Sequence, residues 1–266
     1  MPIKDILIEA CPKDNIAPLF AWAAHINAPL EARLSCVSYA WPRTADFVQS
    51  AILNPLVTSE LEQRMETELA TVRRIGEKAL QSPDLDWCSG VGQPNEALID
   101  HLYTADLLVT IAQTSAHCVT PDPIDLAVRS GTPVLRLKSD IEPSDIDVAV
   151  VAWKDCAAAR RALHSARALL VLAREIHIVG VGDEVSGRRL DEIADFLRRS
   201  DLPAKPIHLP DPKGRPGDVI MDHAFAAGAN IVVSGARSER SLRERLFGNA
   251  TRQFTECPEF SWYISG

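Results

Sequence analysis

The chain repeats part of itself, and this internal repeat constrains the fold more than any other feature of the sequence. Residues 93–112 read QPNEALIDHLYTADLLVTIA, and residues 215–236 read RPGDVIMDHAFAAGANIVVSGA. Aligned with a gap near residue 228, both copies carry an Asp-His pair and end in a short apolar run. Each copy is typical of a helix that leads into a buried strand. We therefore expect one α/β unit to occur twice.

Apolar runs and helical patterns alternate along both halves. DILIEA at 5–10 and DVAVVAW at 147–153 are nearly continuous apolar runs, which suit parallel strands covered on both faces. Residues 59–80, 157–173 and 187–201 have the apolar spacing of helices. This alternation predicts an α/β protein with two Rossmann-like or flavodoxin-like three-layer α/β/α domains, each with a mostly parallel five-stranded sheet.

The polar segment SDIEPSDID at 139–147 separates the two halves. We place the boundary there, which predicts an N-terminal domain over 1–142 and a C-terminal domain over 143–266, each of ordinary domain size. Two similar domains in one chain can pack as an intramolecular pseudo-dimer, and such a pair can associate further as a homodimer.

Composition limits the classes of partner. The net charge of -8 disfavours general binding to nucleic acid or to anionic membranes. No apolar run approaches the roughly 20 residues that a membrane-spanning helix needs, and the N-terminus has no signal-peptide pattern. The 6 cysteines form no CxxC pair and no zinc spacing. We expect a cytoplasmic protein with reduced thiols.

The stretch SGARSERSLRERLFGNATRQF at 234–254 has features of a phosphate-binding loop. It follows an apolar run, and ligands of open parallel sheets bind beyond the carboxyl ends of the strands. Gly235 permits a sharp turn, whereas Gly248 and Asn249 stand where a helix would begin. The free backbone N–H groups of a helix start suit a phosphate, and hydroxyls and arginines lie close by in the sequence. The alternative is a polar connection between a strand and a helix.

Residues 217–252, GDVIMDHAFAAGANIVVSGARSERSLRERLFGNATR, resemble the universal stress protein family of the UspA type, whose ATP loop reads G-x2-G-x9-G-[ST]. VAVVAWKDCAAARRAL at 148–163 resembles the start of that domain. The resemblance implies a tandem bacterial member with the adenine nucleotide alpha hydrolase-like fold and with ATP, together with Mg²⁺, as the ligand of the C-terminal domain. It also implies a degenerate N-terminal domain, because residues 111–133 have no glycine pair.

Several positions depart from the family pattern. Ser238 replaces the second loop glycine, Asn249 replaces the final Ser or Thr, and Lys154 stands where the family has an Asp that contacts adenosine. Val179 matches a position whose backbone contacts adenine. The ligand contacts that the resemblance implies are Gly235, Arg237, Ser238, Gly248, Asn249, Ala250, Thr251, Lys154 and Val179.

Other polar residues offer weaker candidates for chemistry. The pairs Asp100-His101 and Asp222-His223 suggest acid–base or metal chemistry, but adjacent residues on a helix point in different directions. We expect His177 to be a strand residue and GVGDEVSG at 180–187 to be an ordinary loop. There is no HExxH or G-x-S-x-G motif, so no catalytic or metal-binding residues are assigned.

These patterns favour a non-enzymatic stress protein that binds an adenine nucleotide and is recognised by an unknown protein partner. One alternative is an interaction or scaffold protein of the same fold that has lost nucleotide binding, which the changes at Lys154 and Ser238 favour. The other is a weak ATP hydrolase. Its Mg²⁺ would lack a dedicated carboxylate cluster, because Asp155 is the only acidic residue expected at a suitable strand end.

Overall fold

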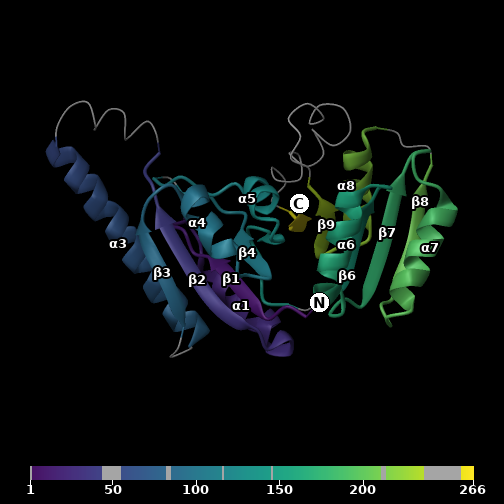
Figure 1. Ribbon diagram of the computed structural model, residues 1–266, viewed down its shortest axis with the longest axis horizontal. Coiled ribbons are helices and arrows are strands. Elements are labelled where there is room, and N and C mark those ends of the chain that lie inside the picture. Colours follow the sequence, from purple (N-terminus) through teal and green to yellow (C-terminus); the bar gives the residue numbers. More distant parts are fainter. Residues whose placement is uncertain are drawn as a thin grey trace. The chain divides into compact units, whose positions relative to one another are not determined.

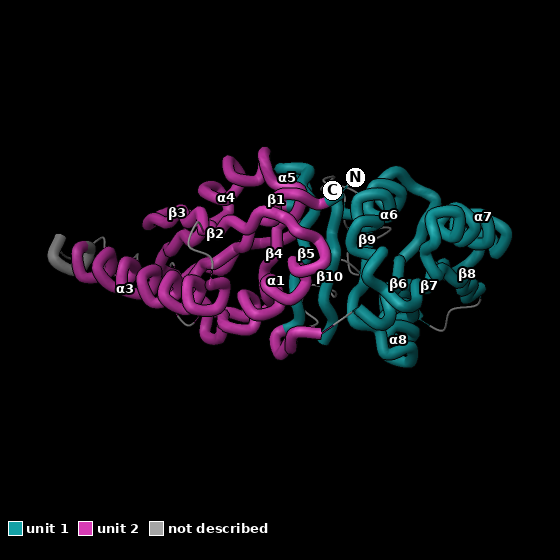
Figure 2. The backbone as a smooth tube through the Cα atoms, turned by 90° about the horizontal axis from the view of Figure 1, so that it is seen from below, with its two compact units in different colours: residues 1–2, 127–138, 145–266 teal, residues 3–126, 139–144 magenta. Residues whose placement is uncertain are grey.

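The computed structural model describes residues 2–43, 55–81, 85–115, 117–144, 146–210, 214–236 and 259–266, with the side chains of the long helix α3 from residue 59 onward. The chain forms two compact units, coloured separately in Figure 2. Unit 2 contains residues 3–126 and 139–144, and unit 1 contains residues 1–2, 127–138 and 145–266. Helices alternate with mostly parallel strands in both, which confirms the predicted α/β class (Figure 1).

Unit 2 contains four parallel strands in the order β3-β2-β1-β4. Its elements are β1 (Asp5–Glu9), α1 (Ala17–Leu30), β2 (Arg33–Ala40), α3 (Pro55–Leu80), β3 (Asp86–Val91), α4 (Pro94–Leu102) and β4 (Leu107–Ile111). The central strands β1 and β4 are almost entirely buried, which explains their near-continuous apolar sequences.

Unit 1 repeats this order with the strands β8-β7-β6-β9. Its elements are β6 (Val148–Trp153), α6 (Ala157–Leu170), β7 (Glu175–Val181), α7 (Gly187–Arg198), β8 (Ala204–Leu209), α8 (Pro216–Ala226), β9 (Ile231–Gly235) and β10 (Ser261–Ser265). Parallel β10 extends the series beside β9, so the second half has the predicted five strands.

The fifth strand of the first half, β5 (Val134–Leu137), follows α5 (Pro123–Ser130) and belongs to unit 1. It pairs antiparallel with β10, with Tyr263 opposite Leu135. Contacts therefore group residues 127–138 with the C-terminal part of the chain, whereas the sequence pattern assigned them to the N-terminal domain. A fifth strand was predicted for this half, but a partner from the far end of the chain was not.

Helices cover both faces of the sheet of unit 1. A Cβ built on Gly235 would meet α6 at Ala158, and one built on Gly180 would meet Leu190 of α7. The register places both glycines on the same face. His177 lies on the opposite face, where it contacts His223 of α8. The unit is thus three-layered, as the sequence predicted.

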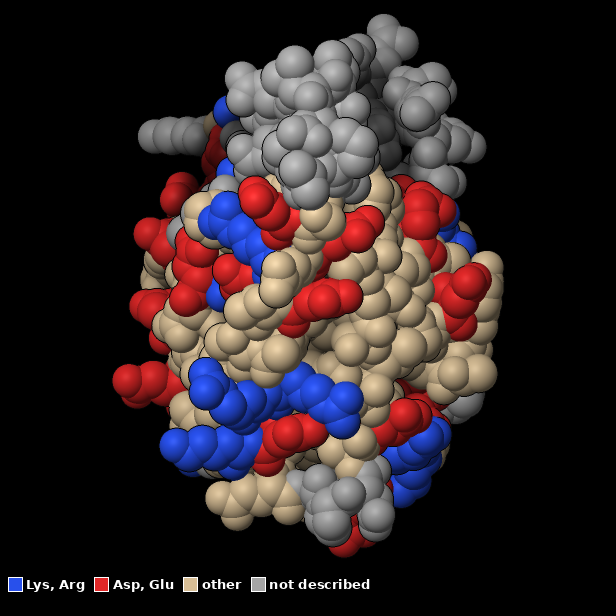
Figure 3. All heavy atoms as spheres, turned by 90° about the vertical axis from the view of Figure 1, so that its left-hand side faces the viewer, with Lys and Arg blue, Asp and Glu red and all other residues tan. Residues whose placement is uncertain are grey.

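Charges of both signs lie on the side of unit 2 that carries α3. Figure 3 shows Lys and Arg side chains among Asp and Glu side chains, without one continuous basic field. On α3 itself, Arg73 Nε lies 2.7 Å from Glu77 Oε1. The part of this face that the structure describes therefore offers no extended positive surface for a phosphate backbone. Within the described ranges, every helix is too short or too polar to cross a membrane.

Candidate functional site at the carboxyl edge of unit 1

The strand order of unit 1 creates a switch point at β6. The chain moves from β6 to β7 on one side and later returns to β9 on the other. Residues that follow these strands meet at one edge of the sheet, where ligands of open α/β sheets bind. Of the predicted ligand contacts, the structure brings Lys154, Val179 and Gly235 to or near this edge. The remaining six, Arg237, Ser238, Gly248, Asn249, Ala250 and Thr251, lie outside the described residues.

Gly235 ends β9 and lies directly against the first turn of α6. A Cβ built on it would be 2.4 Å from the carbonyl carbon and 2.6 Å from the carbonyl oxygen of Ala158. Its predicted role was a sharp turn and an approach to ligand. The contact seen here is between strand and helix, a close approach that only glycine permits.

Val179 lies within β7, with its side chain fully buried. It is paired with Ala152 of β6 on one side and with Ile207 of β8 on the other. Ala152 and Val179 therefore form one row of side chains on the face of the sheet that α8 covers. This row lies next to the carboxyl ends of β6 and β7 and provides an apolar surface there.

Lys154 follows β6 and forms an ion pair with Glu184 in the loop after β7. The Lys154 side chain is 23% exposed, so its ammonium is partly withdrawn from water. Glu184 was not identified from the sequence, and the expectation that Asp155 is the only acidic residue at this edge was wrong. The position of Glu184 shortly after the apolar run of β7 was the available signal.

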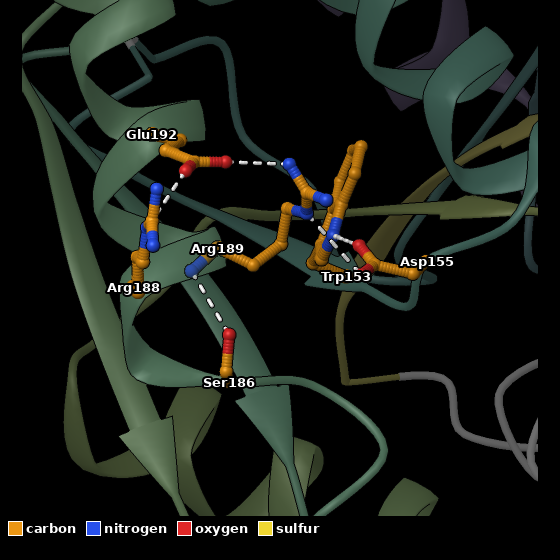
Figure 4. Close-up of polar contacts among 6 residues, drawn as sticks. All are labelled: Trp153, Asp155, Ser186, Arg188, Arg189 and Glu192. Carbon is orange, nitrogen blue, oxygen red and sulfur yellow. Dashed lines mark hydrogen bonds and ion pairs between the residues drawn. The ribbon is translucent and has the colours of Figure 1, made fainter.

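Asp155 is held by neighbouring side chains, as Figure 4 shows. Its Oδ1 accepts a hydrogen bond of 2.9 Å from Trp153 Nε1, and its Oδ2 lies 3.3 Å from Arg189 Nε. Arg189 also pairs with Glu192 on α7. Arg189 is a second cation at the edge that the sequence reading did not identify. The carboxylates that neutralise Arg189 and Lys154 therefore belong to this same chain.

Two backbone features shape the same edge. Helix α6 begins after Cys156 without a side-chain hydrogen bond at its N-cap. Helix α7 is capped conventionally, because Ser186 Oγ accepts a 3.2 Å hydrogen bond from Arg189 N. Within GVGDEVSG, which was predicted to be a loop, only residues 182–186 connect the elements, because Gly180 and Val181 end β7 and Gly187 begins α7. Gly182 has a φ of 75°, and Val185 is buried over Gly180.

The corresponding edge of unit 2 is filled by the protein's own charges. Glu9, at the end of β1, is completely buried and pairs with Lys13, whose side chain is 2% exposed. Thr110 of β4 and the backbone N–H of Cys11 also donate hydrogen bonds to the Glu9 carboxylate. Burial is the main cause that raises the pKa of the Cys11 thiol well above its usual value, so it is held as a neutral group.

The repeated histidines contact strands rather than their neighbouring aspartates. His223 Nε2 lies 2.9 Å from His177 Nδ1, and His177 Nε2 contacts Glu175. His101 Nε2 lies 3.3 Å from the hydroxyl of Tyr39. His177 is the strand residue that was expected, in β7. These contacts link α8 and α4 to their sheets.

Within the described ranges, no group of three His, Cys, Asp or Glu side chains could hold a metal ion. The cysteines there, Cys11, Cys36, Cys88, Cys118 and Cys156, are free thiols. Two carboxylates near the carboxyl edge of unit 1, Glu184 and Asp155, are engaged by Lys154 and Arg189.

The fold is shared with solved universal stress protein structures. The universal stress protein of Archaeoglobus fulgidus DSM 4304 matches 97% of this chain and 95% of its own, with a TM-score of 0.71 and 14% identity. A protein of unknown function from Pseudomonas aeruginosa PAO1 matches 99% of this chain and 92% of its own, with a TM-score of 0.55 and 16% identity. No protein-family model and no curated protein matches the sequence. At these identities the similarity establishes the fold.

Proposed function

We propose that the chain is a tandem universal stress protein whose C-terminal half binds an adenine nucleotide, ATP being the expected ligand. The proposed domains are residues 1–142 and 143–266. The shared fold over nearly the whole chain supports the family, and the loop sequence at 234–254 supports the ligand. The role is regulatory and non-enzymatic, and a protein partner reads the nucleotide-bound state.

The observation that carries this proposal is the difference between the two carboxyl edges. In unit 2 the buried pair of Glu9 and Lys13 fills the edge. In unit 1 Ala152 stands at the strand position of Glu9, so no buried carboxylate fills the edge. Gly235 brings the end of β9 against the start of α6, whose N-cap makes no side-chain hydrogen bond. Backbone N–H groups at a helix start attract phosphate, and Lys154 adds a positive charge beside them.

The alternative of a scaffold without nucleotide is supported by a separate observation. Two cations that the structure describes at the edge are already neutralised, Lys154 by Glu184 and Arg189 by Asp155 and Glu192. A nucleotide would have to displace Glu184 to use the Lys154 ammonium. If that exchange is unfavourable, the edge is a rigid surface for a protein partner.

Nucleotide release and thermal stability separate these functions. Purified protein is denatured and the supernatant is analysed for adenine nucleotides, and the melting temperature is then followed with increasing ATP and Mg²⁺. Binding to the folded state stabilises it by about 2.7 kcal/mol when the ligand is at 100 times its Kd. Gly248→Val should abolish this rise without lowering the ligand-free melting temperature.

The absence of both released nucleotide and a thermal shift would favour the scaffold. Steady phosphate production that Gly248→Val abolishes would instead establish the weak hydrolase.

A further inference from the structure

Ser234 of β9 carries a buried hydroxyl without a partner. The residue is only 5% exposed, and its Oγ makes no hydrogen bond in the part of the chain that the structure describes. Leaving a buried polar group unsatisfied costs the free energy of its lost hydration, so such groups in native proteins require an explanation.

The register places Ser234 at the switch point. Val233 is paired with Val151 of β6, so one step further along the ladder Ser234 lies beside Ala152. Ala152 is paired in turn with Val179. Ser234, Ala152 and Val179 therefore form one row across β9, β6 and β7, on the face covered by α8.

Unit 2 shows what satisfies a hydroxyl at this position. The matching row consists of Thr110, Glu9 and Val37, because Val109 is paired with Ile8 and Glu9 with Val37. There the Thr110 hydroxyl donates to the Glu9 carboxylate. In unit 1 an alanine stands in place of the glutamate, so the carboxylate acceptor is missing and the side chain at this position is shorter.

We propose that the ligand of unit 1 supplies the missing acceptor, and that Ser234 is a base-contacting residue of the site. Its hydroxyl donates a hydrogen bond to a ring nitrogen of the purine, which lies where the Glu9 side chain lies in unit 2. Ala152 provides the space, and Val179 continues the apolar floor. This inference rests on the proposed nucleotide binding in the C-terminal half.

The first test is Ser234→Ala, measured by calorimetric titration with ATP and Mg²⁺ and by thermal melting without ligand. ATP affinity should fall about tenfold, while the ligand-free melting temperature should rise by about 2–4 °C, because an orphan hydroxyl has been removed. Ser234→Thr, which reproduces the residue of unit 2, should keep the affinity within about threefold of the wild type.

Ser38→Ala is the matched control. Ser38 is also completely buried, but its hydroxyl donates to the carbonyl of Ala10 at 2.5 Å. Removing it should lower the melting temperature and leave ATP affinity unchanged.

A second variant transplants the filled edge of unit 2 into unit 1. Ala152→Glu combined with Cys156→Lys reproduces the four-residue spacing of Glu9 and Lys13. The new carboxylate should accept from Ser234 and occupy the base position, so ATP affinity should fall at least 100-fold. Circular dichroism checks that this variant remains folded.

Wild-type protein that binds ATP while Ser234→Ala binds it equally well would overturn the inference and leave the proposed function standing. Retention of ATP affinity by the folded Ala152→Glu, Cys156→Lys variant would also overturn it. Wild-type protein that binds no adenine nucleotide would overturn the proposed function and this inference together.

Discussion

Gly235 shows how a single missing side chain shapes the site. Its Cα packs against the backbone of Ala158, and that helix backbone cannot move away cheaply. The glycine brings β9 and the start of α6 together, so the end of the strand and the uncapped helix start face the same edge. Gly235 thus has a structural role, which is the close packing of β9 on α6.

We predict that Gly235→Ala lowers the free energy of unfolding by about 1–3 kcal/mol, the usual cost of overpacking, as measured by urea denaturation. Gly187→Ala is the control, because the nearest atom to its Cβ would be His208 Nδ1 at an ordinary 3.6 Å. Equal stability of the two variants would show that β9 is free to move away from α6.

His223 makes the stability of unit 1 depend on pH. Burial lowers the pKa of His223, and the charge of nearby His177 lowers it further. In the unfolded chain the pKa of histidine is about 6.5, so between these two values the unfolded state binds more protons. The contribution of neutral His223 to the free energy of unfolding is complete above about pH 6.5. It is lost as the pH falls toward the pKa of His223 in the folded state.

We therefore predict that His223→Gln makes the loss of unfolding free energy between about pH 7 and pH 5 less steep than in the wild type. Urea denaturation across this range measures the slope. His25→Gln, at an exposed position on α1, should retain the wild-type slope. An unchanged slope in His223→Gln would assign the pH dependence to other groups.

At the scale of elements, the ion pair of Glu9 and Lys13 joins the end of β1 to the connection that leads to α1. Through Thr110 it also joins β1 to β4. All of its charge is withdrawn from water, unlike the exposed pair of Arg73 and Glu77 on α3, whose side chains are 51% and 52% exposed.

We predict that Lys13→Met destabilises the protein by about 3–5 kcal/mol in urea denaturation, because a carboxylate is left buried without its cation. Adding Glu9→Gln to this variant should recover part of the loss, since the amide keeps an acceptor for Thr110 and for Cys11 N–H. Arg73→Met should cost no more than about 1 kcal/mol. A Lys13→Met cost as small as that of Arg73→Met would mean that water reaches Glu9.

At the scale of the whole molecule, the last strand completes a unit that contains a segment of the first half. β10 lies between β9, which it pairs in parallel, and β5, which it pairs antiparallel. Trp262 and Tyr263 of β10 are almost completely buried. The chain therefore needs its C-terminal residues before β5 has its partner.

We predict that truncation after residue 258 abolishes cooperative unfolding of unit 1 and causes self-association, because β5 and β9 would expose unpaired edges. Circular dichroism during melting and size-exclusion chromatography measure these effects. A monomeric, cooperatively folded truncated chain would show that β10 is dispensable.

Local periodicity made much of the architecture predictable. The apolar runs of β1 and β6 are nearly continuous because both faces of a central parallel strand are buried, and buried Leu190, Ile193 and Leu197 on α7 follow the expected helical spacing. The histidine and glutamate contacts were not predictable in this way. His177 and His223 are far apart in the chain, and only the packing of α8 against β7 brings their rings together.

The sequence by itself determined that this chain alternates strands and helices, that it repeats, and that its two copies differ in the glycines of the segments after β4 and β9. Those properties are local, because the spacing of apolar residues, the positions of glycines and the composition can each be determined from one continuous segment of the chain. The tertiary structure alone decided that β5 pairs with β10, that Glu9 fills one edge, and that Ser234 faces Ala152 at the other. Strand register determines which distant side chains share a row, and hydrogen-bond satisfaction depends on those neighbours.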